Sequence, residues 1–545
     1  SEISRARDSR ALRSPLGPSL AAAWPGPHAE HFEQALGDFL ADRRWFASKD
    51  RTRTHTRVLD LVPLATGGAH ALVLIEQSFT EGEPDLYLVP LTVVSGPVAD
   101  ELLQVAPHTV VGQIMGTEGL EQLVDGVASG VGLEPILQQF SEGTRGALGA
   151  GHQHGRLYVQ ADCAIVDRLK GISLPNKIEP LEQTNTTVVL GNQFLLKLYR
   201  HIALGLHPEL EMGRFLANTT APVPRLVGSM EYRSQAGECA LGVLHEFVAN
   251  EGNAWEMTVS RLRGAFEQVL ASSNSSAEDL ANLGANFFGL AEKLGERVAD
   301  LHLALVGDET TPDFCPEPFT SFHQRSIYQR ARTMLHRTFD RLKRVEPTVS
   351  PQVGTLITQL LPARRFIDQL LGRVTAVHTA AARIRTHGDL HLGQVLFTGQ
   401  DFVIVDFEGE PARPLHERRY KRCALRDVMG LLRSFDYAVT SELRGGRYRE
   451  EDFLKLKAWG QGFIEQLESH LVAAYYSRAQ GAVFLPTETG AQAALMEFFE
   501  LEKVIYEIRY ELENRPDWLD LPLSGLLRIL RRCGYHLASD NVEIR

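Results

Sequence analysis

RTHGDLHLGQVLFTGQDFVIVDFEGEP, residues 385–411, is the stretch that decides what fold and chemistry to expect. An H-G-D triplet ends at Asp389, five residues ahead of Gln394, and an apolar run then leads to Asp406. Asp389 can orient an attacking hydroxyl or accept its proton, so it is the predicted catalytic residue. Gln394 and Asp406 carry oxygens suited to Mg²⁺ on a nucleoside triphosphate. The spacing therefore predicts phosphoryl transfer from ATP.

The alternative for this stretch is a turn that merely buries an aspartate. An H-G-D triplet alone is a weak signal, because many turns contain one. The amide at Gln394 and the apolar run Phe402–Val405 before Asp406 add weight to the phosphoryl-transfer interpretation. His387 is expected to be structural. Asp427 is expected to anchor the catalytic loop by hydrogen bonds to its backbone.

Size and charge limit the possible functions. The chain has 545 residues and 60.5 kDa, which predicts two to four subdomains rather than one core. Its formal net charge of −12 argues against nucleic acid or an anionic membrane as partner. A protein this acidic that binds ATP must supply positive charge locally, through Lys, Arg or a metal ion.

Cysteines and targeting signals point to the cytoplasm. The five cysteines are scattered without CxxC spacing, which favours reduced thiols over a disulfide framework or zinc site. No apolar run reaches about 18 residues, so no transmembrane helix is expected. Residues 1–18 lack the apolar region of a secretory signal and begin without Met, as a fragment of a longer chain would.

The expected fold class is α+β, a bilobal protein-kinase-like architecture with an extra N-terminal subdomain. Composition predicts a disordered lead-in over 1–27 and a small α+β subdomain over 28–150. Residues 151–250 are expected to form a strand-rich ATP-binding lobe, including a hairpin over 186–199. Residues 251–545 are expected to form a mainly helical lobe that carries the catalytic hairpin and the acceptor site.

Lys197 lies inside the apolar run FLLKLY, where an unpaired charge would be costly. Nucleotide phosphates and a helix carboxylate would satisfy it. Glu209 and Glu211 both lie in HPELEMGRFL, and Glu211 is preferred as the partner because that choice leaves Met212 for packing. The alternative is a lysine on an edge strand that extends its amine to water.

Two further segments are assigned to ATP by their position. The polar segment before the Lys197 strand contains Gln183, Asn185 and Thr186, whose amides and hydroxyl could bind phosphates although no glycine-rich pattern is present. A polar hairpin turn is the alternative. Glu246 and Val248 follow an apolar strand, where backbone groups would meet the adenine edge.

The acceptor site is expected near a late aromatic cluster. Tyr506 and Tyr510 are four residues apart on one helix face, and Glu507 lies beside them. His391 and Glu408, from the catalytic stretch, complete the predicted substrate-binding set. Rings, carboxylates and polar groups together suit a carbohydrate, whereas the alternative is tyrosines packed into the core.

Several motifs in one order resemble the maltokinase family, within the aminoglycoside-phosphotransferase-like kinases. The resemblance runs from about 43 to 523, and the strongest segments are HGDLHLGQVL (387–396), IVDFEGEPARPLHERRYKRCALRDVMGLLRSFDYA (404–438) and KVIYEIRYELENRPDWLDLPL (503–523). The chain departs from the family pattern at Ser48 and Thr184, neither of which is a proposed catalytic group. Residues 250–290 read as an insertion.

The resemblance implies ATP- and Mg²⁺-dependent phosphorylation of maltose to maltose 1-phosphate, for α-glucan (glycogen) synthesis. It also implies that residues 28–150 are an N-terminal cap, and that a trehalose synthase is a partner or a fused domain. Two alternatives stay open: a glucosamine or aminoglycoside kinase of the same fold, and a non-catalytic nucleotide- or glucan-binding module.

Overall fold

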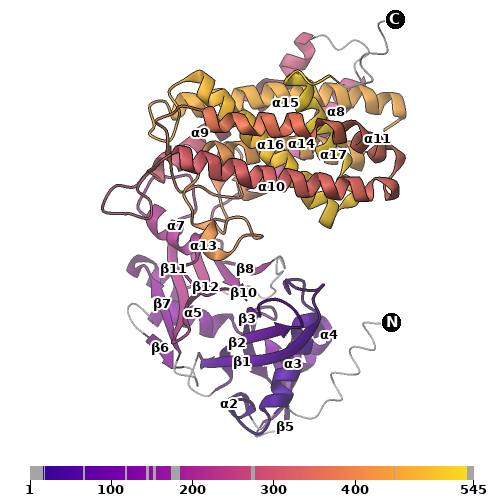
Figure 1. Cartoon of the computed structure of the whole chain (residues 1–545). Coiled ribbons are helices and arrows are strands. Elements are labelled where there is room, and N and C mark those ends of the chain that lie inside the picture. The colour runs from indigo at the N-terminus through magenta and orange to yellow at the C-terminus, as the bar shows by residue number, and fades with distance from the viewer. Residues whose placement is uncertain are drawn as a thin grey trace, which may run out of the picture. The chain divides into compact units, whose positions relative to one another are not determined.

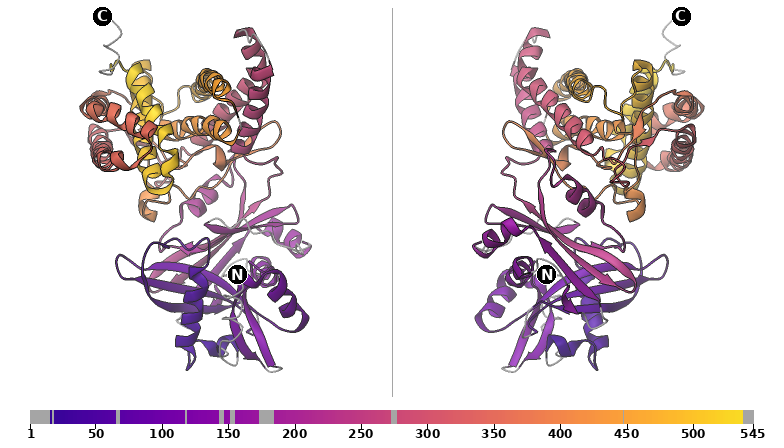
Figure 2. Two further views of the ribbon diagram at one scale, coloured as in Figure 1. Left: turned by 90° about the vertical axis from the view of Figure 1, so that its right-hand side faces the viewer. Right: turned by 90° about the vertical axis from the view of Figure 1, so that its left-hand side faces the viewer.

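The computed structural model describes most of the chain and divides it into two compact units. The first unit comprises residues 1–218, 224–249 and 414–416, and the second comprises 219–223, 250–413 and 417–545. The described residues are 16, 19–64, 68–116, 119–142, 147–150, 155–172, 184–271, 277–446 and 448–536. Figures 1 and 2 show a strand-rich first unit and a helical second unit.

The first unit begins with an antiparallel sheet in the order β1-β2-β3-β5-β4, with β10 paired to β3. One face packs on α3 (Ala29–Ala41), whose Phe32, Leu36 and Leu40 recur at helical spacing and are buried. The strands of this sheet are β1 (Arg53–Pro63), β2 (His70–Phe79), β3 (Asp85–Val94), β4 (Val110–Gly116), β5 (Gly119–Asp125) and β10 (His201–Ile202). The helices flanking it are α2 (Leu20–Ala23), α4 (Gly96–Val105) and α5 (Leu133–Glu142).

A second antiparallel sheet of the first unit has the order β6-β7-β11-β12-β9-β8. It contains the predicted hairpin, in which β8 and β9 pair around a turn where Asn192 has a φ of 53°. The elements of this half are β6 (Ala147–Ala150), β7 (Arg156–Ala161), α6 (Val166–Lys170), β8 (Asn185–Leu190), β9 (Phe194–Tyr199), α7 (Pro208–Leu216), β11 (Leu226–Ser234) and β12 (Gly237–Glu246).

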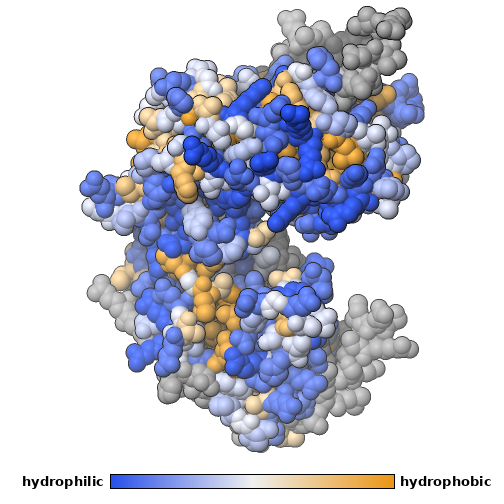
Figure 3. Space-filling model, in the orientation of Figure 1, coloured by the Kyte–Doolittle hydropathy of each residue, from blue (hydrophilic) through white to orange (hydrophobic). Residues whose placement is uncertain are grey.

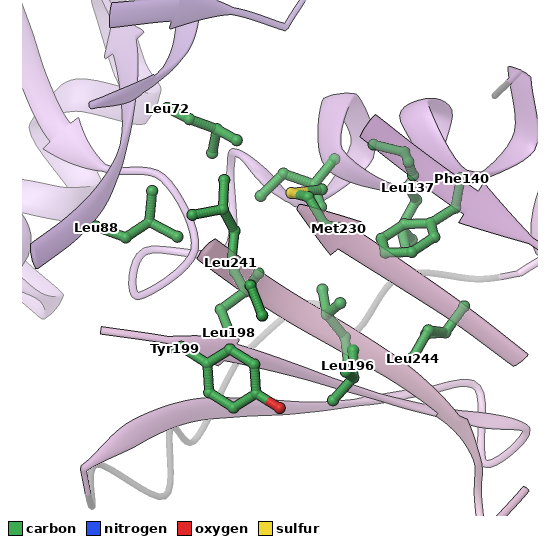
Figure 4. Close-up of a cluster of buried hydrophobic side chains, with 14 of the residues drawn as sticks. Leu72, Leu88, Leu137, Phe140, Leu196, Leu198, Tyr199, Met230, Leu241 and Leu244 are labelled. Carbon is green, nitrogen blue, oxygen red and sulfur yellow. The ribbon is translucent and has the colours of Figure 1, made fainter. Parts of the chain in front are cut away.

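The two sheets share one hydrophobic core. Leu72 and Leu88 from the first sheet belong to the same buried cluster as Leu196, Met230 and the other inward-facing residues of the second sheet. Figure 4 shows these side chains converging, with Phe140 of α5 beside them. The predicted subdomains 28–150 and 151–250 are therefore packed together in a single unit rather than joined by a free linker.

The second unit is a helical assembly in which α9 and α15 pack along each other and α14 contacts α8, α15 and α16. Buried apolar positions at helical spacing, such as Leu431, Phe435 and Val439 of α14, explain this packing. The helices are α8 (Ala254–Ala271), α9 (Ala277–Ala304), α10 (Ser321–Val345), α11 (Pro351–Leu360), α12 (Arg364–Gly372), α14 (Leu425–Gly445), α15 (Glu450–Arg478), α16 (Thr489–Asn514) and α17 (Asp520–Arg532). Short strand pairs join β13 (Glu317–Pro318) to β14 (Ala382–Arg383) and β15 (Val395–Phe397) to β16 (Phe402–Ile404). The short helix α13 (Leu415–Arg418) lies where the chain passes through both units.

Two expectations about order and continuity need correction. The lead-in 1–27 is not disordered throughout: Leu20 and Trp24 are buried on the first sheet's core, because apolar side chains among the Arg and Ser residues find a partner surface. Helical periodicity over residues 351–376 predicts one helix, but the structure divides this segment at Pro362, which has no N–H to donate.

Two other expectations can be compared directly with the structure. All five cysteines are free. Within the described part of the chain, no helix combines the length and the apolar character needed to cross a bilayer.

Candidate active site in two parts

The first part of the site is a buried ionic cluster in the first unit. Lys197 on β9 places its Nζ 2.9 Å from Oε2 of Glu209 on α7. The same oxygen accepts a hydrogen bond of 2.7 Å from the Tyr199 hydroxyl, and Nε2 of His245 on β12 lies 3.8 Å from Oε1. Burial lowers the pKa of His245 despite the nearby carboxylate, so this ring is neutral near pH 7. The carboxylate of Glu209 that pairs with Lys197 thus accepts a second hydrogen bond, from the Tyr199 hydroxyl.

The carboxylate partner of Lys197 is Glu209, and the preference for Glu211 was wrong. Residues 209, 212 and 216 share one face of a helix, so packing Met212 and Leu216 into the core also turns Glu209 inward. Glu211 lies two positions further along and roughly 200° around the helix. The sequence argument identified the packing residues correctly and then chose the wrong carboxylate to accompany them.

Thr186 and Asn185 begin strand β8 and are both buried. The Thr186 hydroxyl accepts a hydrogen bond of 2.7 Å from Nε of Arg200, whose guanidinium also contacts Asp125 at 2.9 Å. Thr186 therefore belongs to a buried hydrogen-bond network inside the first unit. The sequence did not reveal Arg200 as its partner. Gln183, the remaining member of the predicted phosphate-binding segment, lies outside the described residues.

The predicted hinge lies at the end of β12. Glu246 is the last residue of that strand, and its backbone N–H donates to the carbonyl of Arg225. Its carboxylate lies 3.4 Å from Arg168. The next N–H, that of Phe247, donates to Gln193 of the β8–β9 turn, so the hinge backbone is tied to the same hairpin that carries Lys197. Val248 follows just after it.

The catalytic loop of the second unit is fixed through its backbone. Asp427 on α14 accepts hydrogen bonds from the N–H groups of His387 (2.6 Å) and Gly388 (3.0 Å), which confirms its predicted anchoring role. Gly388 has a φ of 89°, a conformation for which glycine is favoured. Asp427 is held in turn by Nε2 of His302 at 3.3 Å, and Tyr475 lies 2.9 Å from Nδ1 of that histidine.

His387 is structural, as expected, and it orients the segment around Asp389. Its Nε2–H donates to the carbonyl of Val405 at 2.9 Å, and its Nδ1 accepts the N–H of Asp389 at 3.4 Å. These bonds tie the loop to the strand that leads to Asp406. The pKa of Asp427 is lowered because the hydrogen bonds and charge from His302 and the loop outweigh the opposing effect of burial.

Gln394 and Asp406 lie side by side. The Gln394 Nε2 donates a hydrogen bond of 2.7 Å to Asp406 Oδ2. Asp406 has a φ of 69°, a sparsely populated region for a residue with a side chain and typical of functional sites. One amide and one carboxylate oxygen fit Mg²⁺, which takes few protein ligands beside water and phosphate.

His391 caps the short 3₁₀ turn that contains Gln394. Its Nδ1 accepts a hydrogen bond of 3.1 Å from the N–H of Gly393. Burial lowers the pKa of His391, while the charge of Asp389 partly opposes this. The ring is therefore a neutral side chain that shapes the loop, rather than a cation.

The predicted aromatic cluster lies on α16. Tyr506 and Tyr510 stack with ring centroids 6.4 Å apart. Burial and the charges of Glu410 and Asp389 together raise the pKa of Tyr506 to about 12. The charge of Asp389, the predicted catalytic residue, thus acts on Tyr506, although the two residues are distant in the sequence.

Glu507 does not lie with the two tyrosines, so its predicted role in binding the acceptor needs correction. It is buried, and its Oε2 lies 2.8 Å from Arg433 on α14. Burial raises its pKa, with Arg433 opposing that shift. Glu507 shares a helix face with the buried Val504 and Glu511, so the helical repeat that exposes Tyr510 turns it inward.

The two glutamates after Asp406 differ in their surroundings. Glu410 is buried and contacts Arg413 at 2.5 Å and Arg426 at 3.5 Å. Burial disfavours its ionised form, but these two arginines outweigh burial and lower its pKa. Glu408 is less buried, and its carbonyl accepts a bond of 3.4 Å from Arg418.

Several site residues were not found from the sequence. Lys503 lies over the Tyr506 ring at 5.1 Å, and its charge acts on His391, Glu410 and Glu507. Its position three residues before Tyr506 on a helix could have revealed it. Tyr199, His245 and His302 carried no such signal, because each depends on contacts between distant segments.

Comparisons with known proteins agree with both parts. Residues 39–128 match the family described as the maltokinase N-terminal cap domain, and residues 177–409 match the phosphotransferase enzyme family. The chain is a phosphotransferase with a maltokinase-type N-terminal cap. The second match contains Lys197, Asp389 and Asp406, so the family assignment covers the residues predicted to carry the chemistry.

Relatives of this phosphotransferase include two glucosamine kinases. The protein from Mycolicibacterium smegmatis is 24% identical over 362 residues, which cover 64% of this chain and 78% of that protein. The protein from Streptacidiphilus jiangxiensis is 26% identical over 360 residues, which cover 64% and 72%. A solved glucosamine kinase in complex with glucosamine, ADP and inorganic phosphate shares the fold, with a TM-score of 0.58 and 17% identity over 90% of this chain and 98% of that one.

Proposed function

We propose that this phosphotransferase transfers the γ-phosphoryl group of ATP to the anomeric hydroxyl of maltose, giving maltose 1-phosphate. The observation that carries the maltose assignment is the match of residues 39–128 to the maltokinase N-terminal cap domain. The phosphoryl-transfer assignment rests on the phosphotransferase match and on the anchored catalytic loop with its adjacent Gln394 and Asp406.

Each part of the site has a role in the proposed reaction. Lys197, fixed by Glu209, would pair with ATP phosphates and offset their charge. Asp389, held through its own N–H and its neighbours, would orient the acceptor hydroxyl and accept its proton. Gln394 and Asp406 would hold Mg²⁺, which when bound neutralises charge on the transferred phosphoryl group.

The surroundings of Tyr506 favour a neutral sugar over an amino sugar. The charged groups of Lys503 and Arg509 lie 5.1 Å and 5.7 Å from the centre of its ring. A protonated amine bound beside Tyr506 would meet two like charges at this distance. Maltose offers hydroxyls and apolar CH faces, which the tyrosine rings and these donors can contact without that repulsion.

The test is ADP release with Mg²⁺-ATP and maltose, glucosamine, glucose or trehalose, followed by NMR of the product. The proposal predicts turnover with maltose and a phosphorus nucleus coupled to the anomeric proton. Turnover with glucosamine and none with maltose would reject the proposed acceptor while leaving phosphoryl transfer in place. Nucleotide binding without turnover on any sugar would support the binding-module alternative.

Glucosamine is the second candidate acceptor, because both curated relatives described above are glucosamine kinases. Glu410 and Asp389, which act electrostatically on Tyr506, could attract an amine. A Lys503→Gln substitution separates the two candidates. If the acceptor is maltose, the substitution replaces a charged donor with a weaker neutral one and raises the KM. If the acceptor is glucosamine, it removes a repulsive charge and lowers the KM.

A further inference from the structure

A cluster of basic side chains in the second unit carries more positive charge than its neighbours balance. The cluster consists of residues from α10, β14, the segment between β16 and α14, and the start of α14: Arg330, Arg383, Arg413, Lys421, Arg422 and Arg426. We call these six the basic cluster. None of them belongs to the residues assigned above to ATP, Mg²⁺ or the acceptor.

Most members of the basic cluster are paired with glutamates. Glu317 contacts Arg383 at 2.7 Å and Lys421 at 2.9 Å. Glu410 lies between Arg413 and Arg426, at 2.5 and 3.5 Å. Glu417 lies 3.6 Å from Arg413, and Glu502 lies 3.4 Å from Arg426. Among the described residues, six cationic side chains therefore face four carboxylates.

Arg422 and Arg330 account for the excess. Arg422 is only 8% exposed, and its guanidinium donates to the backbone carbonyl of Glu417 at 3.0 Å. Within the described part of the chain, neither arginine has a carboxylate within 4 Å. A guanidinium as buried as Arg422 is costly without an anionic partner. Arg330 is exposed on α10.

The electrostatics of the cluster agree with its unpaired charge. Burial and the like charges of Arg426, Arg413 and Arg330 lower the pKa of Arg422 to about 9. Burial, Arg383, Arg330 and Arg422 lower the pKa of His323 on α10 to about 4, so this ring stays neutral. Burial and the neighbouring positive charges therefore act together against ionisation of Arg422 and His323. Figure 3 shows that strongly hydrophilic residues dominate the face of the second unit over α10.

We infer that Arg330 and Arg422, together with the rest of the basic cluster, bind the phosphate group of a phosphate monoester. A dianion matches the excess of two positive charges, and planar guanidinium groups can donate paired hydrogen bonds to a tetrahedral oxyanion. The acidic balance of the whole chain, −12, shows that this positive region is local rather than a general property of the surface.

The position of the basic cluster connects it to the acceptor region. Glu410 contacts Arg413 and Arg426 in the cluster, and its charge also acts on Tyr506. An anion bound at Arg422 would draw these arginines toward itself and weaken their hold on Glu410. A bound phosphate monoester would therefore alter the acceptor region directly. This inference does not depend on which sugar is the acceptor.

The experiment is calorimetric titration of inorganic phosphate, methyl phosphate and acetate into the full chain saturated with Mg²⁺ and a non-hydrolysable ATP analogue. Saturation fills the nucleotide site, so any remaining phosphate binding lies elsewhere. We expect inorganic phosphate and methyl phosphate to bind with one site, and acetate to bind more weakly. Arg330→Gln should weaken methyl phosphate binding about tenfold or more, because a charged hydrogen bond is lost.

Two further variants make the result decisive. Arg325→Gln removes an exposed arginine from the same helix outside the cluster and should leave phosphate affinity unchanged. Arg422→Gln should also weaken binding, and a melting curve establishes that it is folded. Equal affinity in wild type and Arg330→Gln, or no methyl phosphate binding to wild type, would overturn the inference. Neither result would alter the measured turnover on maltose, so the two proposals fail separately.

Discussion

The two units hold their candidate functional groups in different ways. In the first unit, Lys197 is fixed by a side-chain pair with Glu209, which Tyr199 supports. In the second unit, Asp389 belongs to a loop whose backbone N–H groups are bound by Asp427, and Asp427 is held by His302. The first arrangement depends on one buried pair of side chains, whereas the second joins the loop of Asp389 through its backbone to the core of a helical unit. Four predictions test this difference, beginning with the largest expected effect.

Asp389→Asn should lower turnover by about 10²–10⁴-fold, because the amide cannot accept the acceptor proton. The loop is held by backbone bonds to Asp427, which this substitution leaves intact, so the melting temperature should stay within about 1 °C of wild type. Initial rates of ADP release and a thermal melt measure both. Asp313→Asn, at an exposed site, is the matched control. Turnover near the wild-type rate would reject the catalytic role.

Glu209→Gln should lower kcat/KM for ATP by about 10–150-fold, since the charge-assisted bond to Lys197 is lost. Glu211→Gln, two positions further along the same helix, should have a clearly smaller effect. Measuring the two variants side by side tests the pairing directly. A larger loss from Glu211→Gln would restore the partner that the sequence suggested.

Asp427→Asn should reduce both stability and activity. One of the two loop N–H groups would then face an amide donor, which costs about 1–3 kcal/mol. Urea unfolding measures the stability, and kcat should fall while KM for ATP changes little, because Lys197 lies in the other unit. Glu451→Gln, an exposed residue at the start of α15, is the control. Loss of kcat with unchanged stability would show that the anchoring is not structural.

Glu468→Gln should stabilise the fold without changing activity, and it should do so at pH 8 but not at pH 4.5. Burial and the charge of Asp436 raise the pKa of Glu468 to about 8, against an ordinary value of 4.5. The folded state therefore binds the extra proton between these values, and stability falls as pH rises through this window. The substitution should raise the melting temperature at pH 8 by at least about 2–4 °C, with little change at pH 4.5. Glu465→Gln, exposed on the same helix, should show no such pH dependence.

Local pattern was enough to predict the loop that carries Asp389 and the strand pair after it, but not all partners of the candidate residues. The spacing from Asp389 to Gln394 and Asp406 correctly indicated a loop followed by a strand pair, and the structure brings the last two side chains together. Asp427 could be assigned because a carboxylate at a helix start near such a loop has few other roles. Glu507 was assigned to the acceptor with Tyr506, although its position on the helix turns it inward. Glu211 was preferred to Glu209, which lies about 200° around the same helix and pairs with Lys197. The role of residues such as His302 depends on contacts across more than 100 positions, which no local pattern contains.

Domain boundaries illustrate the same limit. Alternating or clustered apolar residues over 58–64, 71–79 and 86–93 predicted three strands, which the structure confirms as β1, β2 and β3. That the two sheets bury one another could not be predicted, because alternation shows that a face is apolar and not what covers it.

The core shared by the two sheets has a consequence for the synthesis of this chain. Leu88 leaves the ribosome well before Leu244, although both belong to one buried cluster. At about 5–20 residues per second, roughly 8–30 s pass between the synthesis of Leu88 and that of Leu244. For that time the apolar face of the first sheet has no partner strand to cover it. During that interval a translating chain presents an incomplete core, and a nascent-chain chaperone has a defined surface to cover. A version that begins near residue 150 would leave the kinase-like sheet with the corresponding face exposed from the start.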